Sequence, residues 1–191
     1  MKSGVRALGV AESFRGDDAS VDRSTLAGAV VRRDRVVDGL GYAACTVGGT
    51  DATAAVESLV DDVARPDVRY VLLGAVAPAW YNLLDLSRIH EAAERPVLAV
   101  TFEASDGLEA GLRDAFSGPE LQQRLETYRS LPDRRDVSVN DETVYVRHLG
   151  CDADEAREIV RAFTPDGGRP EPLRVARLAA RAANAYLGDR E

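Results

Sequence analysis

The stretch Cys45–Val63, CTVGGTDATAAVESLVDDV, decides the fold, because it passes from a strand-like run through two glycines into a helix. After Asp51, apolar residues recur at helical spacing on one face, and acidic residues recur on another. Gly48 and Gly49 permit a tight turn, and Thr50 or Asp51 can accept hydrogen bonds from the first N–H groups of the helix. We therefore predict a strand-to-helix junction, which is an ordinary connection and also a place where an anion or metal can bind.

The segments before this junction are predicted to be strands, and most segments after it alternate between helix and strand. The predicted strands are 5–14, 26–31, 36–47, 68–76 and 96–102, with a polar loop at 15–24, a short hairpin within 137–148 and helices between and after the later strands. The fourth and fifth strands should be parallel, because a helix separates them. Three antiparallel strands followed by two parallel ones predict an α/β fold. It is a ribonuclease H-like mixed five-stranded sheet, with helices on both faces and helical additions at the C-terminal end.

The chain has 191 residues, of which 45% are hydrophobic, so it is long enough to bury one substantial core. We expect a single domain over residues 1–191. No run approaches the roughly 18 apolar residues of a membrane span, and the N-terminal apolar region is too short for a secretory signal. These features predict a cytoplasmic protein without a membrane partner. Cys45 and Cys151 lack metal-ligand spacing, which favours two reduced thiols over a zinc site.

The formal net charge of −8 opposes generic binding to nucleic acid, because proteins that hold phosphates usually carry a basic face. A nucleic-acid role therefore requires a local basic patch or bound metal ions. Lys2 is the sole lysine, and aspartate outnumbers glutamate. Such a composition is typical of a saline cytoplasm or of a GC-rich genome, and the sequence leaves both explanations open.

Three acidic residues lie where the predicted strands or their connections end. Glu12 follows the first strand, Asp51 lies at the glycine junction, and Asp85 lies beyond the fourth strand. Converging carboxylates can hold two Mg²⁺ or Mn²⁺ ions roughly 3.5–4 Å apart for phosphodiester hydrolysis. These acids are therefore candidate catalytic residues and metal ligands. The alternative is that two of them cap helices and Glu12 is a solvated loop residue.

Two further groups of residues are suited to contact nucleic acid. Trp80 and Tyr81 lie in the turn APAWYN, where they can stack on a base or instead cover the core. Arg174, Arg177 and Arg181 form a basic stripe on the last predicted helix, which can contact phosphates or instead form a solvated face with ion pairs. The chain has no Walker loop, no GxGxxG before a helix and no GxSxG, so we expect neither a nucleotide cofactor nor a serine triad.

Four segments in collinear order resemble the endonuclease dU family of archaea, which is related to endonuclease V. They are RALGVAES at 6–13, TVGGTDAT at 46–53, APAWYNLLDL at 77–86 and PEPLRVARLAARA at 170–182. The resemblance implies a ribonuclease H-like fold and metal-dependent cutting of DNA at deaminated bases such as uracil. It also implies that Mg²⁺ or Mn²⁺ is the cofactor and that DNA or RNA with deaminated bases is the partner.

The matching segments transfer functional expectations to particular residues of this chain. These are Asp51 and Thr53 of DAT, Asn82 and Asp85 of YNLLD, and Glu171 with Arg174 of PEPLR. Under this resemblance Trp80 and Tyr81 contact an extruded base, and Asn82 is a further nucleic-acid-binding residue. The arginines of the last helix hold phosphates.

The chain also departs from the family pattern at four positions. Ala11 stands where the first-strand motif has an acid, Gly48 and Gly74 stand where aspartates are expected, and Arg177 stands where histidine is expected. Glu12 does not automatically replace an acid at position 11, because neighbouring strand residues point to opposite faces. Loss of the acid at position 74 removes a central metal ligand. The sequence thus leaves two hypotheses: a metal-dependent endonuclease, or a non-catalytic relative that binds nucleic acid or another protein through the same cleft.

Overall fold

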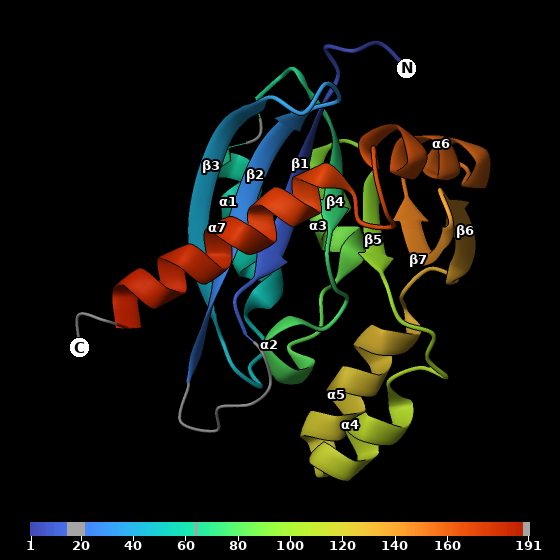
Figure 1. The fold of residues 1–191 in the computed structure, drawn as a ribbon. Coiled ribbons are helices and arrows are strands. Elements are labelled where there is room, and N and C mark those ends of the chain that lie inside the picture. The colour runs from blue at the N-terminus through green and yellow to red at the C-terminus, as the bar shows by residue number, and fades with distance from the viewer. Residues whose placement is uncertain (15–21, 64, 189–191) are drawn as a thin grey trace.

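The computed structural model describes residues 1–14, 22–63 and 65–188, and within them the chain forms one mixed sheet with helices on both faces (Figure 1). The strands lie in the spatial order β3-β2-β1-β4-β5-β7-β6. They are β1 Arg6–Glu12, β2 Arg23–Arg32, β3 Val37–Thr46, β4 Val68–Leu73, β5 Val97–Thr101, β6 Arg135–Val139 and β7 Glu142–Leu149. Residues 15–21 of the predicted polar loop lie outside the described residues, and β2 already begins at Arg23.

The predicted ribonuclease H-like order is confirmed in the first five strands. β2 pairs antiparallel with β1 and β3, whereas β4 lies parallel to β1 and β5. The sheet is larger than the predicted five strands, because β7 pairs antiparallel with β5 and β6 extends it further. Alternate residues of this hairpin, such as Val137 and Val146, pack on the helix that follows it, which explains why the hairpin joins the sheet.

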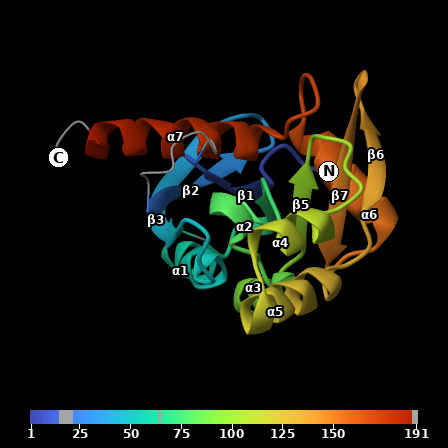
Figure 2. The ribbon, with the colours of Figure 1, turned by 90° about the horizontal axis from the view of Figure 1, so that it is seen from below.

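The helices cover both faces of the sheet. They are α1 Ala52–Val63, α2 Pro78–Tyr81, α3 Leu86–Ala93, α4 Glu109–Ala115, α5 Gly118–Arg129, α6 Ala153–Phe163 and α7 Glu171–Gly188. α1 and α3 pack on one face, and α6 and α7 pack on the other (Figure 2). The helix predicted after the glycine junction is confirmed, and its apolar face contributes Val56, Leu59 and Val60 to the core. α4 and α5 form a separate pair beyond the carboxyl end of β5.

A glycine in β1 determines how closely α7 approaches the sheet. An added Cβ at Gly9 would lie 2.3 Å from the backbone carbon of Pro172, so a side chain there would collide with the first turn of α7. Further along α7, Ala176 packs with Ala29 and the partly buried Ala11. Small residues on both elements therefore hold α7 directly over β1 and β2.

Two observations bear on the expected cellular environment. None of the helices in the described part of the chain combines the length and apolarity needed to cross a membrane. Cys45 is buried, Cys151 is partly buried, and both thiols are free. Burial raises the pKa of Cys45 to about 12 and that of Cys151 to about 11, so both remain protonated at neutral pH.

Candidate functional site

A cleft opens at the carboxyl ends of β1, β4 and β5, the edge at which open α/β sheets usually bind ligands. It consists of two adjoining hollows of about 90 Å³ and about 460 Å³. The residues that line both hollows are Glu12, Gly74, Ala75, Arg169 and Arg177. The larger hollow extends from the end of β4 past Thr101 to Tyr128 of α5. This cleft is therefore the place to assess the predicted site residues.

Glu12 is the acidic residue that lines both hollows. Its carboxylate accepts a hydrogen bond of 2.5 Å from the backbone N–H of Ala79. Burial raises the pKa of Glu12 from 4.5 to about 7, and the Ala79 hydrogen bond and the charge of Arg177 oppose that rise. Glu12 is thus a partly buried strand residue that is only partly ionised at neutral pH, and not a solvated loop glutamate.

Ala11, near the end of β1, and Gly74, directly after β4, lie on the opposite face of the sheet from Glu12. Ala11 packs with Ala176 beneath α7, and an added Cβ at Gly74 would lie 3.6 Å from the Cβ of Ala11. The predicted alternation is confirmed, since Glu12 projects away from the position that an acid at residue 11 would occupy. Neither Ala11 nor Gly74 provides a side-chain oxygen that could bind a metal.

Asp51 uses its carboxylate to hold the glycine junction together. The carboxylate accepts hydrogen bonds from the backbone N–H of Thr46 at 2.9 Å, from the Thr46 hydroxyl at 2.8 Å and from the amide of Asn82 at 2.7 Å. Burial alone would raise the pKa of Asp51, but these hydrogen bonds outweigh it and lower the pKa. The predicted acceptor for the first helical N–H groups is Thr50 or Asp51, whereas the N–H of Ala52 donates to the amide oxygen of Asn82 at 3.0 Å.

The other residues of the YNLLD and DAT segments are also used within the fold. Asn82 is fully buried, and its amide binds the chain on both sides of the junction. Thr53 is buried, and its hydroxyl accepts from the backbone N–H of Asp85 at 3.0 Å. The Asp85 carboxylate caps α3 by accepting from the N–H groups of Ser87 and Arg88, which confirms the helix-cap alternative.

The carboxylates described above do not fit a two-metal site. Among residues 1–14, 22–63 and 65–188, no three His, Cys, Asp or Glu side chains are grouped so that they could hold a metal ion. The oxygens of Asp51 and Asp85 bind backbone and side-chain donors of the fold, and positions 11 and 74 have no oxygen to offer. The expected Mg²⁺ or Mn²⁺ therefore has no convergent set of ligands in the described chain.

Arginines dominate the charge of the larger hollow. They are Arg134, Arg147, Arg169 and Arg177. None of the four lies within salt-bridge distance of a carboxylate in the described parts of the chain. Instead, the guanidinium groups of three of them lie on aromatic rings, with Arg169 at 3.7 Å from the centre of Phe102. The cleft thus carries positive charge in a chain whose net charge is −8.

The predicted basic stripe on α7 divides between two environments. Arg174 is exposed and forms a bidentate ion pair with Glu171, in which both nitrogen–oxygen distances are 2.6 Å. Arg177 lines the cleft, and its charge acts on Glu12 and on Arg169. Arg181 also acts electrostatically on Arg169. The ion-pair alternative therefore describes Arg174, whereas Arg177 faces the cleft.

Comparison with known proteins now identifies the family of the chain. The family profile of endonuclease dU matches residues 3–184. The chain belongs to the endonuclease dU family. It is 32% identical to a UPF0215 protein of Pyrobaculum aerophilum, covering 94% of this chain and 95% of that relative. It is 34% identical to a UPF0215 protein of Thermococcus gammatolerans, covering 84% and 81%.

Solved structures extend the comparison to the fold. The chain is similar to a protein of unknown function from Archaeoglobus fulgidus, with a TM-score of 0.79, 24% identity and coverage of 94% and 98%. It is also similar to endonuclease V of Ciona intestinalis, solved in complex with DNA containing an inosine, with a TM-score of 0.60, 12% identity and coverage of 96% and 87%. This endonuclease dU family member therefore has the ribonuclease H-like fold of endonuclease V.

At the glycine junction of this endonuclease dU family member, both glycine N–H groups are used within the fold. The N–H groups of Gly48 and Gly49 donate to the backbone oxygens of Ala79 and Thr46. Gly48 adopts a φ of 68°, as its predicted turn requires. The carbonyl groups of both glycines accept from the buried guanidinium of Arg124 in α5, a residue that sequence reasoning missed.

The turn after β4 presents an aromatic side chain beside this junction. Ala79, Trp80 and Tyr81 all have positive φ values, between 48° and 61°, so α2 is a left-handed turn and not a regular helix. Trp80 is 48% exposed as a residue, and its ring packs against the rings of Tyr81 and Phe116. Such strain is maintained only where the surrounding packing imposes it, and it keeps the Trp80 ring at the surface.

Proposed function

We propose that this endonuclease dU family member binds nucleic acid in the cleft at the carboxyl ends of β1, β4 and β5. The observation that carries the proposal is the set of four cleft arginines, none of which lies within salt-bridge distance of a carboxylate in the described chain. A protein of net charge −8 needs a local basic surface to bind phosphates, and this cleft provides one.

The strand would contact the protein through two kinds of side chain. The cleft arginines suit the phosphates, because guanidinium groups donate two parallel hydrogen bonds to phosphate oxygens. Trp80 suits a base, since exposed aromatic rings stack on any base. Deaminated bases such as uracil are the proposed targets, in keeping with the family and with the inosine-containing DNA bound to the Ciona intestinalis endonuclease V.

Metal-dependent cutting is the second candidate function, and membership of the endonuclease dU family favours it. In that case Glu12, Asp51 and Asp85 are the proposed ligands of Mg²⁺ or Mn²⁺. Of these, Glu12 lines the cleft, and the other two bind groups of the fold. We therefore favour binding without hydrolysis over this candidate.

One experiment separates the two functions. Labelled oligonucleotides with uracil, hypoxanthine or only standard bases are incubated with the protein in Mg²⁺, in Mn²⁺ and in EDTA, and both binding and cleavage are followed. Binding without cleavage in any condition is expected. Cleavage that requires a metal and disappears in Glu12→Ala would establish the endonuclease. Absence of binding to all three oligonucleotides would reject the nucleic-acid function.

A further inference from the structure

The packing of α7 places Arg177 beside the end of β1. Pro172 contacts Gly9, and one turn later Ala176 packs in a cluster with Ala11. Arg177 follows Ala176 directly and lines both hollows of the cleft. The guanidinium group is therefore held at the end of β1 by close helix-on-strand packing, and not by a flexible loop.

Ala11, near the end of β1, and Gly74, directly after β4, are small, uncharged residues. An added Cβ at Gly74 would be accommodated, because the nearest atoms to it are Val10 O at 3.4 Å, Ala11 Cβ at 3.6 Å and a Leu173 methyl at 3.8 Å. These are ordinary contacts, and Gly74 is not among the residues with positive φ. Positions 11 and 74 add no carboxylate beside Arg177, so the counter-charge that acts on it comes from Glu12, which is only partly ionised at neutral pH.

Arg169 brings a second positive charge to the same place. It belongs to the segment between α6 and α7, is partly buried against the ring of Phe102, and lines both hollows together with Arg177. Burial and the charges of Arg177 and Arg181 lower the pKa of Arg169. Two repelling guanidinium groups that share a cleft are stabilised by an anion that bridges them, and a phosphodiester has the required oxygens and charge.

We propose that Arg169 and Arg177 hold one phosphodiester group of the bound strand directly, without a divalent cation, and that Ala11 and Gly74 preserve this mode by adding no carboxylate. The proposal rests on the proposed nucleic-acid function and specifies how its cleft binds phosphate. It makes residues 11 and 74 determinants of metal dependence, because two carboxylates there would neutralise Arg177 and repel the phosphate.

The first test measures binding of a labelled single-stranded oligonucleotide by fluorescence anisotropy, in excess EDTA and in excess Mg²⁺. The unmodified protein should bind at least as tightly in EDTA as in Mg²⁺. Arg177→Ala should weaken binding in EDTA about tenfold and should reduce the slope of log affinity against log salt by roughly 0.7, the value of one single-strand phosphate contact. Arg177→Lys should restore the slope but not the full affinity. Arg157→Ala, at a half-buried arginine of α6 that is paired with Asp154 and lies outside the cleft, is the control and should change neither quantity.

The second test adds the missing carboxylates. The double variant A11D/G74D should lose at least about tenfold in affinity in EDTA, whereas the matched neutral variant A11N/G74N should stay within about threefold of the unmodified protein. Circular dichroism checks that both variants fold. Equal losses in the two double variants would overturn the electrostatic role of these positions, since the two differ in charge and hardly in shape.

The outcomes distinguish this inference from the function on which it rests. If the unmodified protein binds the oligonucleotide only when Mg²⁺ or Mn²⁺ is present, the metal-free site is wrong although the nucleic-acid function stands. If it binds in EDTA and Arg177→Ala has no effect, the phosphate lies elsewhere in the cleft. If it binds under neither condition, the proposed function itself fails and the inference fails with it.

Discussion

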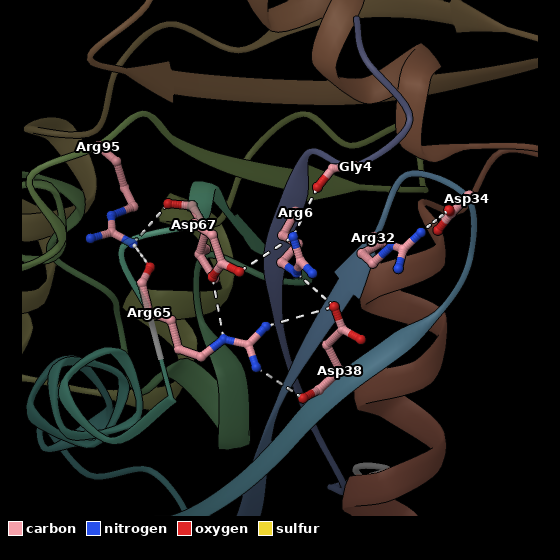
Figure 3. A network of polar contacts seen from close by, with 9 residues as sticks. Gly4, Arg6, Arg32, Asp34, Asp38, Arg65, Asp67 and Arg95 are labelled. Atoms are coloured by element: carbon pink, nitrogen blue, oxygen red, sulfur yellow. Dashed lines mark hydrogen bonds and ion pairs between the residues drawn. The ribbon is translucent and has the colours of Figure 1, made fainter.

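Arginines have different kinds of contact at the two ends of the central strands β1 and β4. At the end where β1 and β4 begin, Arg6 and Arg65 are each paired with Asp38 and Asp67, at distances from 2.6 to 3.7 Å (Figure 3). We call these four residues the ion-pair network. At the end where the same strands finish, Arg134 and Arg169 lie on aromatic rings, and no cleft arginine lies within salt-bridge distance of a carboxylate of the described chain.

The difference shows what each group of arginines does. In the ion-pair network, charges of both signs alternate and join β1, β3 and the connection that precedes β4, so the arginines complete the fold. In the cleft, like charges face each other, as the effect of Arg177 on Arg169 shows. Such an arrangement is unfavourable without an anion, and a fold retains it where a ligand supplies the anion. Substitutions at the two ends should therefore affect different measurements.

The largest effect is expected from the double variant R169A/R177A. Each guanidinium group that binds phosphate contributes about 1.5 kcal/mol or more, so oligonucleotide affinity should fall about 100-fold. The midpoint of thermal unfolding should not fall, because the substitution removes a repulsion. Anisotropy titration and thermal denaturation measure the two quantities. A loss of thermal stability in parallel with the loss of binding would show that these arginines stabilise the fold, as those of the ion-pair network do.

The corresponding substitution at the other end of the strands is Asp38→Ala in the ion-pair network. It leaves Arg6, whose Nε lies 2.6 Å from the carboxylate, without its nearest partner. The pair is only partly buried, so we expect a loss of about 2 kcal/mol in the free energy of unfolding, below the roughly 3–5 kcal/mol of fully buried pairs. Chemical denaturation measures this loss, and oligonucleotide affinity should be unchanged. Weaker binding in a fully folded Asp38→Ala protein would contradict the division of roles between the two ends.

The order of the fold could be predicted from the sequence because its determinants are local. Apolar periodicity defined α1, proline positions bounded β4, and the helix between β4 and β5 required that these strands be parallel. The strand count was too low because the membership of a short hairpin in a sheet depends on what packs against it. α6, which follows the hairpin in the chain, provides that contact.

The site was less predictable because the role of a carboxylate depends on neighbours that only folding supplies. Asp51 and Asp85 occupy positions that suit either metal ligands or structural acceptors, and their contacts with Thr46 and Ser87 arise only in the folded chain. Arg169 comes from a glycine-rich connection, and Arg147 comes from β7, far along the chain from the motifs that carry the resemblance. Glycines and a proline around Arg169 signalled a turn, but nothing local indicated that it faces the cleft.

Glu12, at the cleft end of β1, should make the stability of the protein depend on pH. Its pKa is about 7 in the folded chain and near 4.5 in the unfolded chain, so the unfolded state releases the proton first as pH rises. Stability should therefore fall between these two pH values. Because the cleft is open to solvent, we expect a loss of about 1–2 kcal/mol, and not the full shift.

Glu12→Gln removes this dependence while keeping an acceptor for the Ala79 N–H. The variant should be more stable than the unmodified protein above about pH 8 and equally stable below about pH 4, as measured by denaturation across the pH range. The exposed Glu91→Gln controls for loss of one negative charge. A stability difference that is the same at every pH would show that the substitution acts through packing and not through the proton.

The smallest effect is expected from Trp80→Ala, which tests the proposed base contact of this exposed ring beside the glycine junction. Loss of one stacked base should weaken oligonucleotide binding by about 1 kcal/mol, close to fivefold, without changing the salt dependence, because no phosphate contact is removed. Trp80→Phe should keep most of the affinity, since it retains a ring against Phe116. If Trp80→Ala instead lowers the salt slope as Arg177→Ala is expected to do, the ring acts by positioning the arginines. Trp80 and the cleft arginines would then form one contact with phosphate and not two separate contacts with base and backbone.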